Sequence, residues 1–168
     1  MLAYQHGDAG AFETLYKRHR GALYRFVLRS LHQRSAAEEL FQEVWMRVIE
    51  ARGRYAPQAR FTTWLYTIAH NLLVDHWRKK GLTLVELNED EMVAAPDNPA
   101  RQAEARETLA RFLQALEALP HAQREAFLLH EEGGLSVAEI AAATGTNEEA
   151  AKSRLRYAVA KLKAVVDE

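Results

Sequence analysis

Residues 136–166 read SVAEIAAATGTNEEAAKSRLRYAVAKLKAVV, and this stretch predicts a helix, a tight turn and a second helix. Ser136 and Glu139 have the spacing of a capping box, in which the hydroxyl and the carboxylate satisfy free amide groups at a helix start. Gly145 is the residue type that ends a helix with a positive φ angle. The end of the chain is therefore expected to be a helix-turn-helix.

The second of these helices, which either Thr146 or Asn147 would cap, has two different faces. Five cations and no acid lie between residues 150 and 166. A stripe of small and apolar residues with a cationic outer face, after a glycine turn, suits insertion into the major groove of DNA. An ordinary two-helix corner with a solvated charged face fits the same pattern. The expected apolar stripe consists of Ala151, Leu155, Ala158 and Leu162.

The net charge of −1 hides a strong segregation along the 168 residues. Residues 1–81 carry 13 Lys/Arg against 7 Asp/Glu, residues 82–100 carry five acids and no base, and residues 101–168 carry 9 bases against 11 acids. Twelve of the 15 aromatic residues also lie in residues 1–81. Local patches therefore decide whether the chain binds nucleic acid, and the near-neutral total does not argue against it.

Several classes of protein are disfavoured by composition. The chain has no cysteine, which excludes disulfides, thiol redox chemistry and cysteine-ligated zinc. It has no apolar run near 18 residues, and its first residues lack the cationic start and apolar core of a signal peptide. We expect an intracellular, cytoplasmic protein without membrane insertion and without a cofactor.

Nearly every other segment also has helical periodicity. Helices are expected over 9–31, from a second capping box at Ser35 and Glu38 to about Arg52, over 62–80, over 101–118 and from Pro120 to 130. Residues 82–100 contain two prolines and an acidic cluster, a composition typical of a linker. The fold class predicted is all-α. It comprises two small helical domains, 1–81 and 105–168, joined by an acidic flexible linker, 82–104.

The expected helix 62–80 carries groups that can bind unpaired bases. Its apolar stripe is expected to bury Trp64, Ile68 and Leu72, and it ends in three consecutive cations, Arg78 to Lys80. Aromatic and amide groups beside a cationic track are what unstacked bases need. Alternatively, the tryptophans belong to the core and the cations only complement the helix dipole. Four residues are expected to face solvent: Tyr66, Thr67, His70 and Asn71.

The expected helix 36–52 turns an acidic face outward in an otherwise basic region. Its buried stripe would consist of Leu40, Phe41, Val44 and Val48. The opposite face would then carry Glu38, Glu39, Gln42, Glu43 and Arg47. Such a face is poor for DNA and suits the basic surface of a protein partner, although a glutamate-rich helix face also serves simple solubility.

Three stretches in series resemble the extracytoplasmic-function (ECF) sigma factors of bacterial RNA polymerase. AEELFQEVWMRVIEARGRY is similar to their polymerase-binding helix, and FTTWLYTIAHNLLVDHWRKK is similar to their promoter −10 helix. The stretch from Leu119 to Leu162 is similar to their −35-reading domain. The resemblance covers about residues 7–163.

This resemblance implies a set of binding residues and partners. Its implied partners are core RNA polymerase, promoter DNA and an anti-sigma factor, with a monomer expected outside the holoenzyme. It implies polymerase docking by Glu39, Gln42 and Glu43. It implies −10 DNA binding by Tyr55, Ile68, Asn71, Arg78, Lys79 and Lys80. It implies −35 DNA binding by Glu149, Lys152, Ser153, Arg156 and Tyr157.

The chain departs from the family pattern in the last helix. Tyr157 and Val159 stand where the family usually has arginine, and Ala151 stands where valine is usual, so the −35 preference is not carried over. An autonomous helix-turn-helix repressor is the alternative function, but it leaves the cationic, aromatic helix 61–80 without a role. We do not expect an enzyme. The best candidate metal cluster, His70 with Asp75 and His76, is not spaced for one helical face.

Overall fold

The computed structural model describes residues 1–81 and 101–167, apart from the side chains of 101–104. The acidic stretch 82–100 lies outside the described residues. The described parts contain helices and no strand, which confirms the all-α fold class. No described helix is both long and apolar enough to cross a membrane. The helices are α1 (Leu2–Gln5), α2 (Ala9–Leu31), α3 (Arg34–Glu50), a 3-10 turn η1 (Arg52–Arg54), α4 (Phe61–Lys79), α5 (Arg101–Glu117), α6 (His121–Glu131), α7 (Val137–Thr144) and α8 (Glu148–Val166).

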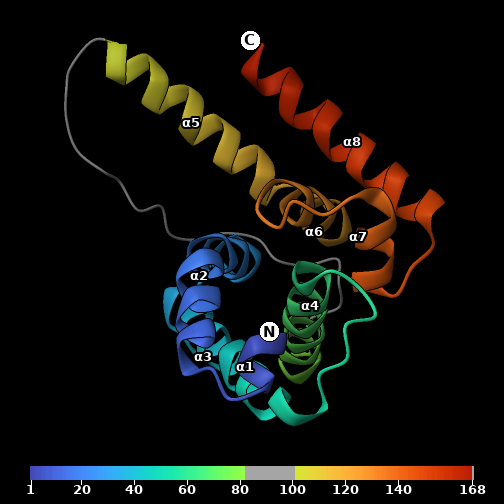
Figure 1. Ribbon diagram of the computed structural model, residues 1–168. Helices are drawn as coiled ribbons and strands as arrows, with labels where there is room; N and C mark the ends of the chain where they lie inside the picture. The colour runs from blue at the N-terminus through green and yellow to red at the C-terminus, as the bar shows by residue number, and fades with distance from the viewer. Residues whose placement is uncertain (82–100, 168) are drawn as a thin grey trace.

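The first helical unit consists of α1 to α4, and α2, α3 and α4 pack on one another around its core (Figure 1). Each of the three helices turns an apolar stripe inward, since apolar residues recur at three- and four-residue intervals. Burying one such side chain completely stabilises the fold by about 1.5–3 kcal/mol. The fully buried residues of this core include Leu23, Phe26, Val27, Val44, Val48, Leu65, Ala69 and Leu73.

The predicted start of α3 was wrong. Gln33, not Ser35, has the extended backbone of an N-cap residue, and no side chain caps this end. Ser35 lies inside the helix, and Glu38 accepts a hydrogen bond from Arg34 at 3.0 Å instead of closing a capping box. The reason is the residue before Gln33. His32, the C-cap of α2, has the left-handed conformation (φ 57°). The short connection that follows brings the chain into α3 at once.

The second helical unit consists of α5 to α8 and contains the predicted helix-turn-helix. The capping box is present, since Ser136 accepts from the Glu139 amide and the Glu139 carboxylate accepts from the Ser136 amide. Gly145 ends α7 with φ 63°, and Asn147, rather than Thr146, caps α8. The predicted stripe of α8 is buried at three of its four positions, and Leu155 is only half-buried.

The two units lie against each other (Figure 1). α7 packs on α4, and α6 packs on α2. Leu128, Leu129 and Leu135 of the second unit belong to the same hydrophobic cluster as the core of the first. The side chains that face outward in this arrangement are therefore those available to other molecules.

Candidate nucleic-acid interface

The buried face of α4 differs from the predicted one. Leu65, Ala69 and Leu73 face the core, whereas the expected core stripe of Trp64, Ile68 and Leu72 is only half-buried. Tyr66 and His70 were expected to face solvent. Tyr66 is instead 1% exposed, and the His70 side chain is 15% exposed. Thr67 is half-buried, and of the four only Asn71 is exposed.

The half-buried stripe of α4 forms one wall of a hollow. This hollow has a volume of about 300 Å³, at the lower end of the range for ligand pockets. Its other wall comes from the end of α3 and from η1. The hollow therefore combines apolar side chains, the exposed amide of Asn71 and charged groups at its rim. The lining residues are Arg47, Ala51, Arg54, Trp64, Ile68, Asn71, Leu72 and Asp75.

Tyr55 stands behind this hollow and does not line it. Its ring meets the Trp64 ring edge-on, with 4.9 Å between the ring centroids. The Gln5 side-chain amide donates to the Tyr55 backbone carbonyl at 2.9 Å, which ties the loop after η1 to α1. Tyr55 is 8% exposed, and burial raises the pKa of its hydroxyl. The structure therefore gives Tyr55 the geometry of a support for Trp64.

The three cations at the end of α4 are all exposed, as expected. The Arg78 guanidinium pairs with Asp75 at 3.5 Å, and the Lys80 ammonium donates to the Gln33 side chain at 3.1 Å. Lys79 is exposed next to them. Asp75 also lines the hollow, so this cationic track begins at its rim.

The outer face of α3 is more apolar than the sequence analysis recognised. Glu39, Gln42 and Glu43 are exposed as expected, and Glu43 pairs with Arg47 at 3.2 Å. Met46 is 53% exposed and Ile49 is 40% exposed. Met46 lies four residues after Gln42 and Ile49 seven, so both share its face of α3. This spacing in the sequence could have revealed them.

The outer face of α8 carries the five predicted residues. Glu149, Lys152, Arg156 and Tyr157 are exposed, and Ser153 is half-buried. Lys152 and Arg156 are four residues apart and therefore lie one above the other on one side of the helix. The Arg156 guanidinium lies 5.3 Å from the centroid of the Tyr157 ring, a cation–π contact that orients it.

His32 is a half-buried polar residue that the sequence analysis missed. Arg124 donates a hydrogen bond to its Nε2, and the Glu117 carboxylate lies 3.5 Å from its Nδ1. His32 thus joins α2 to α5 and α6 as a neutral imidazole. The pKa of His32 is lowered to about 4 by burial, by Arg124 and by His121, in that order.

The candidate metal cluster does not form. The Nδ1 atom of His70 lies 2.6 Å from a carboxylate oxygen of Glu125 on α6, so His70 serves the contact between the units. Asp75 pairs with Arg78. The part of the chain that the structure describes contains no group of three or more acidic, histidine or cysteine side chains suited to a metal ion.

Comparison with known proteins shows the family of the chain. Residues 15–83 match the family model of Sigma-70 region 2, and residues 109–162 match that of Sigma-70 region 4. The chain is 33% identical to the RNA polymerase sigma factor CarQ of Myxococcus xanthus over all of its length and 96% of that protein. It is 34% identical to the ECF RNA polymerase sigma factor BldN of Streptomyces coelicolor over 91% of its length, which spans 59% of that protein.

Solved structures show the same fold. The structure of CnrH in complex with the cytosolic domain of CnrY matches with a TM-score of 0.68 at 26% identity, over 97% of this chain and 92% of that one. The sigma factor RpoE of Bartonella quintana, in complex with the anti-sigma factor NepR, matches with a TM-score of 0.75 at 24% identity, over 94% and 97%. The two family models and these relatives identify the chain as a regulator of transcription. The chain belongs to the ECF sigma factors.

The environment of His32 predicts a defined dependence of stability on pH. Because its folded pKa lies below the ordinary 6.5, the stabilisation from neutral His32 is complete above pH 6.5 and is lost as the pH falls toward 4. His32→Asn retains a hydrogen-bond acceptor and tolerates positive φ, but it does not titrate. We expect the melting temperature of the parent to fall more steeply than that of the variant between pH 6.5 and pH 4.5. Parallel melting curves of the two proteins across this range would contradict the assignment.

Proposed function

We propose that this chain directs promoter-specific initiation by RNA polymerase, with its first unit docking on the polymerase and capturing unpaired −10 bases and its second reading the −35 element. The observation that carries this proposal is the hollow beside Asn71 in one unit, combined with an exposed cationic recognition helix in the other. We assign residues 1–81 to the first function and residues 105–168, together with the first turn of α5, to the second. The predicted linker, 82–104, overlaps α5 (Arg101–Glu117) at residues 101–104.

Polymerase docking is proposed for the outer face of α3. Exposed apolar side chains ringed by polar and charged ones are typical of a protein interface, and Met46 and Ile49 lie beside Gln42 and Glu43 in this way. The acidic residues would meet a basic surface on the partner and set the orientation of docking. The apolar pair would supply the desolvated centre of the contact.

Base capture is proposed for the hollow between α3 and α4. Trp64 and Ile68 offer apolar surface to one extruded base, and the exposed Asn71 amide can both donate to and accept from its Watson–Crick edge. Arg78, Lys79 and Lys80 would neutralise the phosphates of the same strand as it leaves the hollow. Tyr55 would act through Trp64, because it touches that ring and does not line the hollow.

Major-groove reading is proposed for the outer face of α8. A recognition helix contacts base edges through side chains near its N-terminus, and Glu149, Lys152, Ser153, Arg156 and Tyr157 lie along its first three turns. An arginine can donate two hydrogen bonds to guanine, whereas a lysine more often meets a phosphate. Arg156, which Tyr157 orients, is therefore assigned to bases and Lys152 to the backbone.

An anti-sigma factor is the proposed regulatory partner. The support is the co-crystal structure of the Bartonella quintana sigma factor with NepR, whose fold this chain shares. The repressor alternative is not favoured, because the matched family models cover both units and not the helix-turn-helix alone.

The docking face should be separable from DNA recognition. Gln42→Ala combined with Glu43→Lys should weaken binding to core polymerase by at least about tenfold, since a charge reversal against a basic surface is unfavourable. The first unit should stay folded, because both side chains point away from the core. Glu13→Lys, an exposed reversal on α2, is the matched control. If fluorescence anisotropy gave the double variant and the control equal affinity for core polymerase, the docking face would be wrongly placed.

Base capture should depend on the Asn71 amide. An Asn71→Ala holoenzyme should still bind duplex promoter but should open it poorly, because the extruded base loses its edge contacts. Permanganate footprinting of unpaired thymines measures this step. Gln114→Ala, which removes an exposed amide on α5, should leave the footprint unchanged. Equal thymine reactivity with Asn71→Ala and with the parent would remove Asn71 from the mechanism.

Arg156 and Lys152 should contribute differently to recognition of the −35 element. Arg156→Ala should relax base preference at one or two positions, with a loss of about 1–3 kcal/mol in discrimination. Lys152→Ala should weaken all promoters alike and reduce the salt dependence by about one charge. Selection over randomised −35 sequences measures both effects, with the exposed Lys163→Ala as control. Unchanged base preferences in Arg156→Ala would show that α8 enters the groove on another face.

A further inference from the structure

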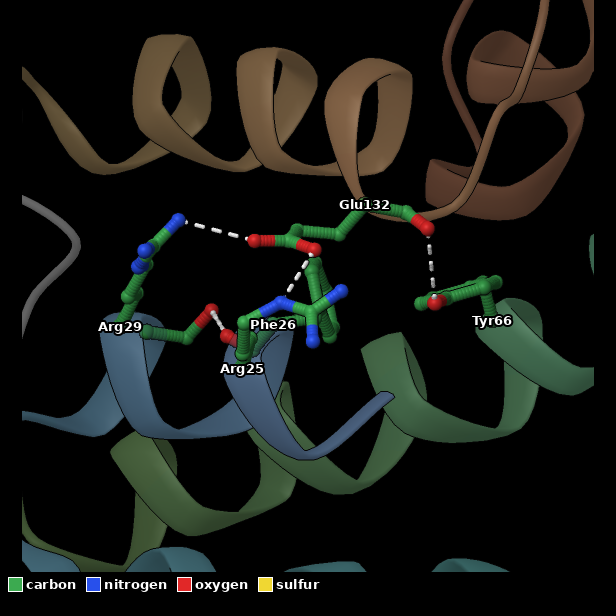
Figure 2. Close-up of polar contacts among 6 residues, drawn as sticks. Arg25, Phe26, Arg29, Tyr66 and Glu132 are labelled. Atoms are coloured by element: carbon green, nitrogen blue, oxygen red, sulfur yellow. Dashed lines mark hydrogen bonds and ion pairs between the residues drawn. The ribbon is translucent and has the colours of Figure 1, made fainter. Parts of the chain in front are cut away.

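The two walls of the hollow between α3 and α4 are held in place very differently. The α4 wall is fixed from its far side, where the Tyr66 ring stands edge-on to Phe26 of the core, at 5.2 Å between ring centroids. The Tyr66 hydroxyl also donates to the Glu132 carbonyl at 3.5 Å (Figure 2). Glu132 in turn contacts Arg25 and Arg29 of α2, at 2.8 Å to each guanidinium. Any movement of α4 would therefore break several packed contacts.

The opposite wall comes from η1 and has little support of its own. Ala51, just before this three-residue turn, and Arg54, at its end, line the hollow. The loop that follows, residues 55–60, is described in full, and its backbone forms one internal hydrogen bond, from the Gln58 amide to the Ala56 carbonyl at 2.9 Å. The position of this wall therefore depends on contacts from elsewhere in the chain.

The short helix α1 supplies such contacts. The Gln5 side-chain amide donates to the Gly53 carbonyl at 3.5 Å and to the Tyr55 carbonyl at 2.9 Å. An amide NH₂ group has two hydrogens, so it can serve both acceptors at once. The guanidinium carbon of Arg52 lies 4.6 Å from the centroid of the Tyr4 ring, a cation–π contact. α1 thus holds both η1 and the first residue of the loop after it.

The position of α1 is in turn set by α2. With four residues, α1 is too short to be stable as an isolated helix. Tyr4 is 8% exposed, and its ring centroid lies 5.1 Å from that of Phe12 on α2. Gly7 turns the chain with φ 105°, and Asp8 then caps α2 by accepting from the Ala11 amide at 3.2 Å. α1 is therefore fixed to α2, and η1 takes its position from α1.

We propose that α1 supports the base-binding hollow, and that Gln5 and Tyr4 are positioning residues for the captured base. Through η1, α1 sets the place of Arg54 at the rim. Through Tyr55, whose ring backs that of Trp64 at 4.9 Å between centroids, α1 sets the apolar wall. The proposal rests on the proposed function, which assigns this hollow to one unpaired −10 base. It adds that selectivity for this base depends on a helix that does not itself line the hollow.

Base capture can be measured apart from all other contacts. The probe is a promoter whose −10 element is already unpaired, bound by the holoenzyme, with either the base or an abasic site at each −10 position in turn. The ratio of the two affinities cancels polymerase docking, −35 binding and any change in overall charge.

Gln5→Glu keeps the shape of the side chain but removes its donor. This variant should lower the affinity ratio by about three- to tenfold, the effect of one lost hydrogen bond. Gln5→Lys, which can donate again, should restore most of the ratio. Gln114→Glu, the same change at an exposed position of α5, should leave the ratio at the value of the parent.

The environment of Trp64 gives a second readout that needs no polymerase. The chain has three tryptophans, so labelling with 5-fluorotryptophan gives three fluorine resonances, and Trp64→Phe identifies the one from Trp64. Gln5→Glu should shift or broaden this resonance and leave that of Trp77, near the other end of α4, unchanged. Tyr4→Leu, which keeps apolar bulk but removes the ring beside Arg52, should act in the same way.

The outcomes separate the support by α1 from the proposed function. If Gln5→Glu leaves both the Trp64 resonance and the affinity ratio as in the parent, α1 does not support the hollow. A shifted resonance beside an unchanged ratio would also overturn the proposal, because α1 would then position the wall and not the base. A Gln5→Lys variant as poor as Gln5→Glu would exclude the hydrogen bonds as the cause. A parent ratio near one at every −10 position would refute base capture itself, while the resonances still decide whether α1 positions Trp64.

Discussion

The pairing of the buried Glu125 carboxylate with His70 fixes how the two helical units sit. A buried charge without a partner is strongly destabilising, so the position of α6 is tied to that of α4. Trp77 and His121 pack beside this pair, and the leucines of α6 complete one hydrophobic cluster with the first unit. Apolar burial supplies most of the stabilisation, and the ionic contacts select one orientation among those that would bury similar area.

That orientation leaves the proposed recognition surfaces outside the contact between the units. The outer face of α3, the hollow beside Asn71 and the cationic face of α8 are all exposed, although Tyr66 and His70 of α4 are covered. A single helix, α4, thus contacts the core on one face, the second unit on another and the proposed base site on a third. This division accounts for a helix that is apolar around most of its circumference yet carries an exposed amide and three exposed cations.

The sequence predicted the fold well where local chemistry decides it. The capping box at Ser136, the positive φ of Gly145 and the stripe of α8 depend on neighbouring residues, and the structure contains all three, with Leu155 half-buried. The buried face of α4 was predicted one residue out of place, because two adjacent apolar stripes compete and only tertiary contact selects between them. Ser35 failed as a cap because the preceding helix ends at His32.

The cross-unit pairs of Glu125 and Glu132 join residues 55 to 107 positions apart, which no local pattern reveals. Of the residues that the resemblance assigned to −10 DNA binding, Ile68 and Asn71 line the hollow and Tyr55 does not. The sequence analysis did not single out the exposed Met46 and Ile49.

The central claim is that this chain confers promoter specificity on RNA polymerase. Run-off transcription with purified bacterial core polymerase over a library of promoter sequences tests it most directly. The account predicts transcripts that begin at defined sites, require both the chain and the core enzyme, and share a −10 and a −35 sequence. Binding of the chain to DNA with repression, or no specific transcript from any template despite a folded chain and an active core enzyme, would contradict it.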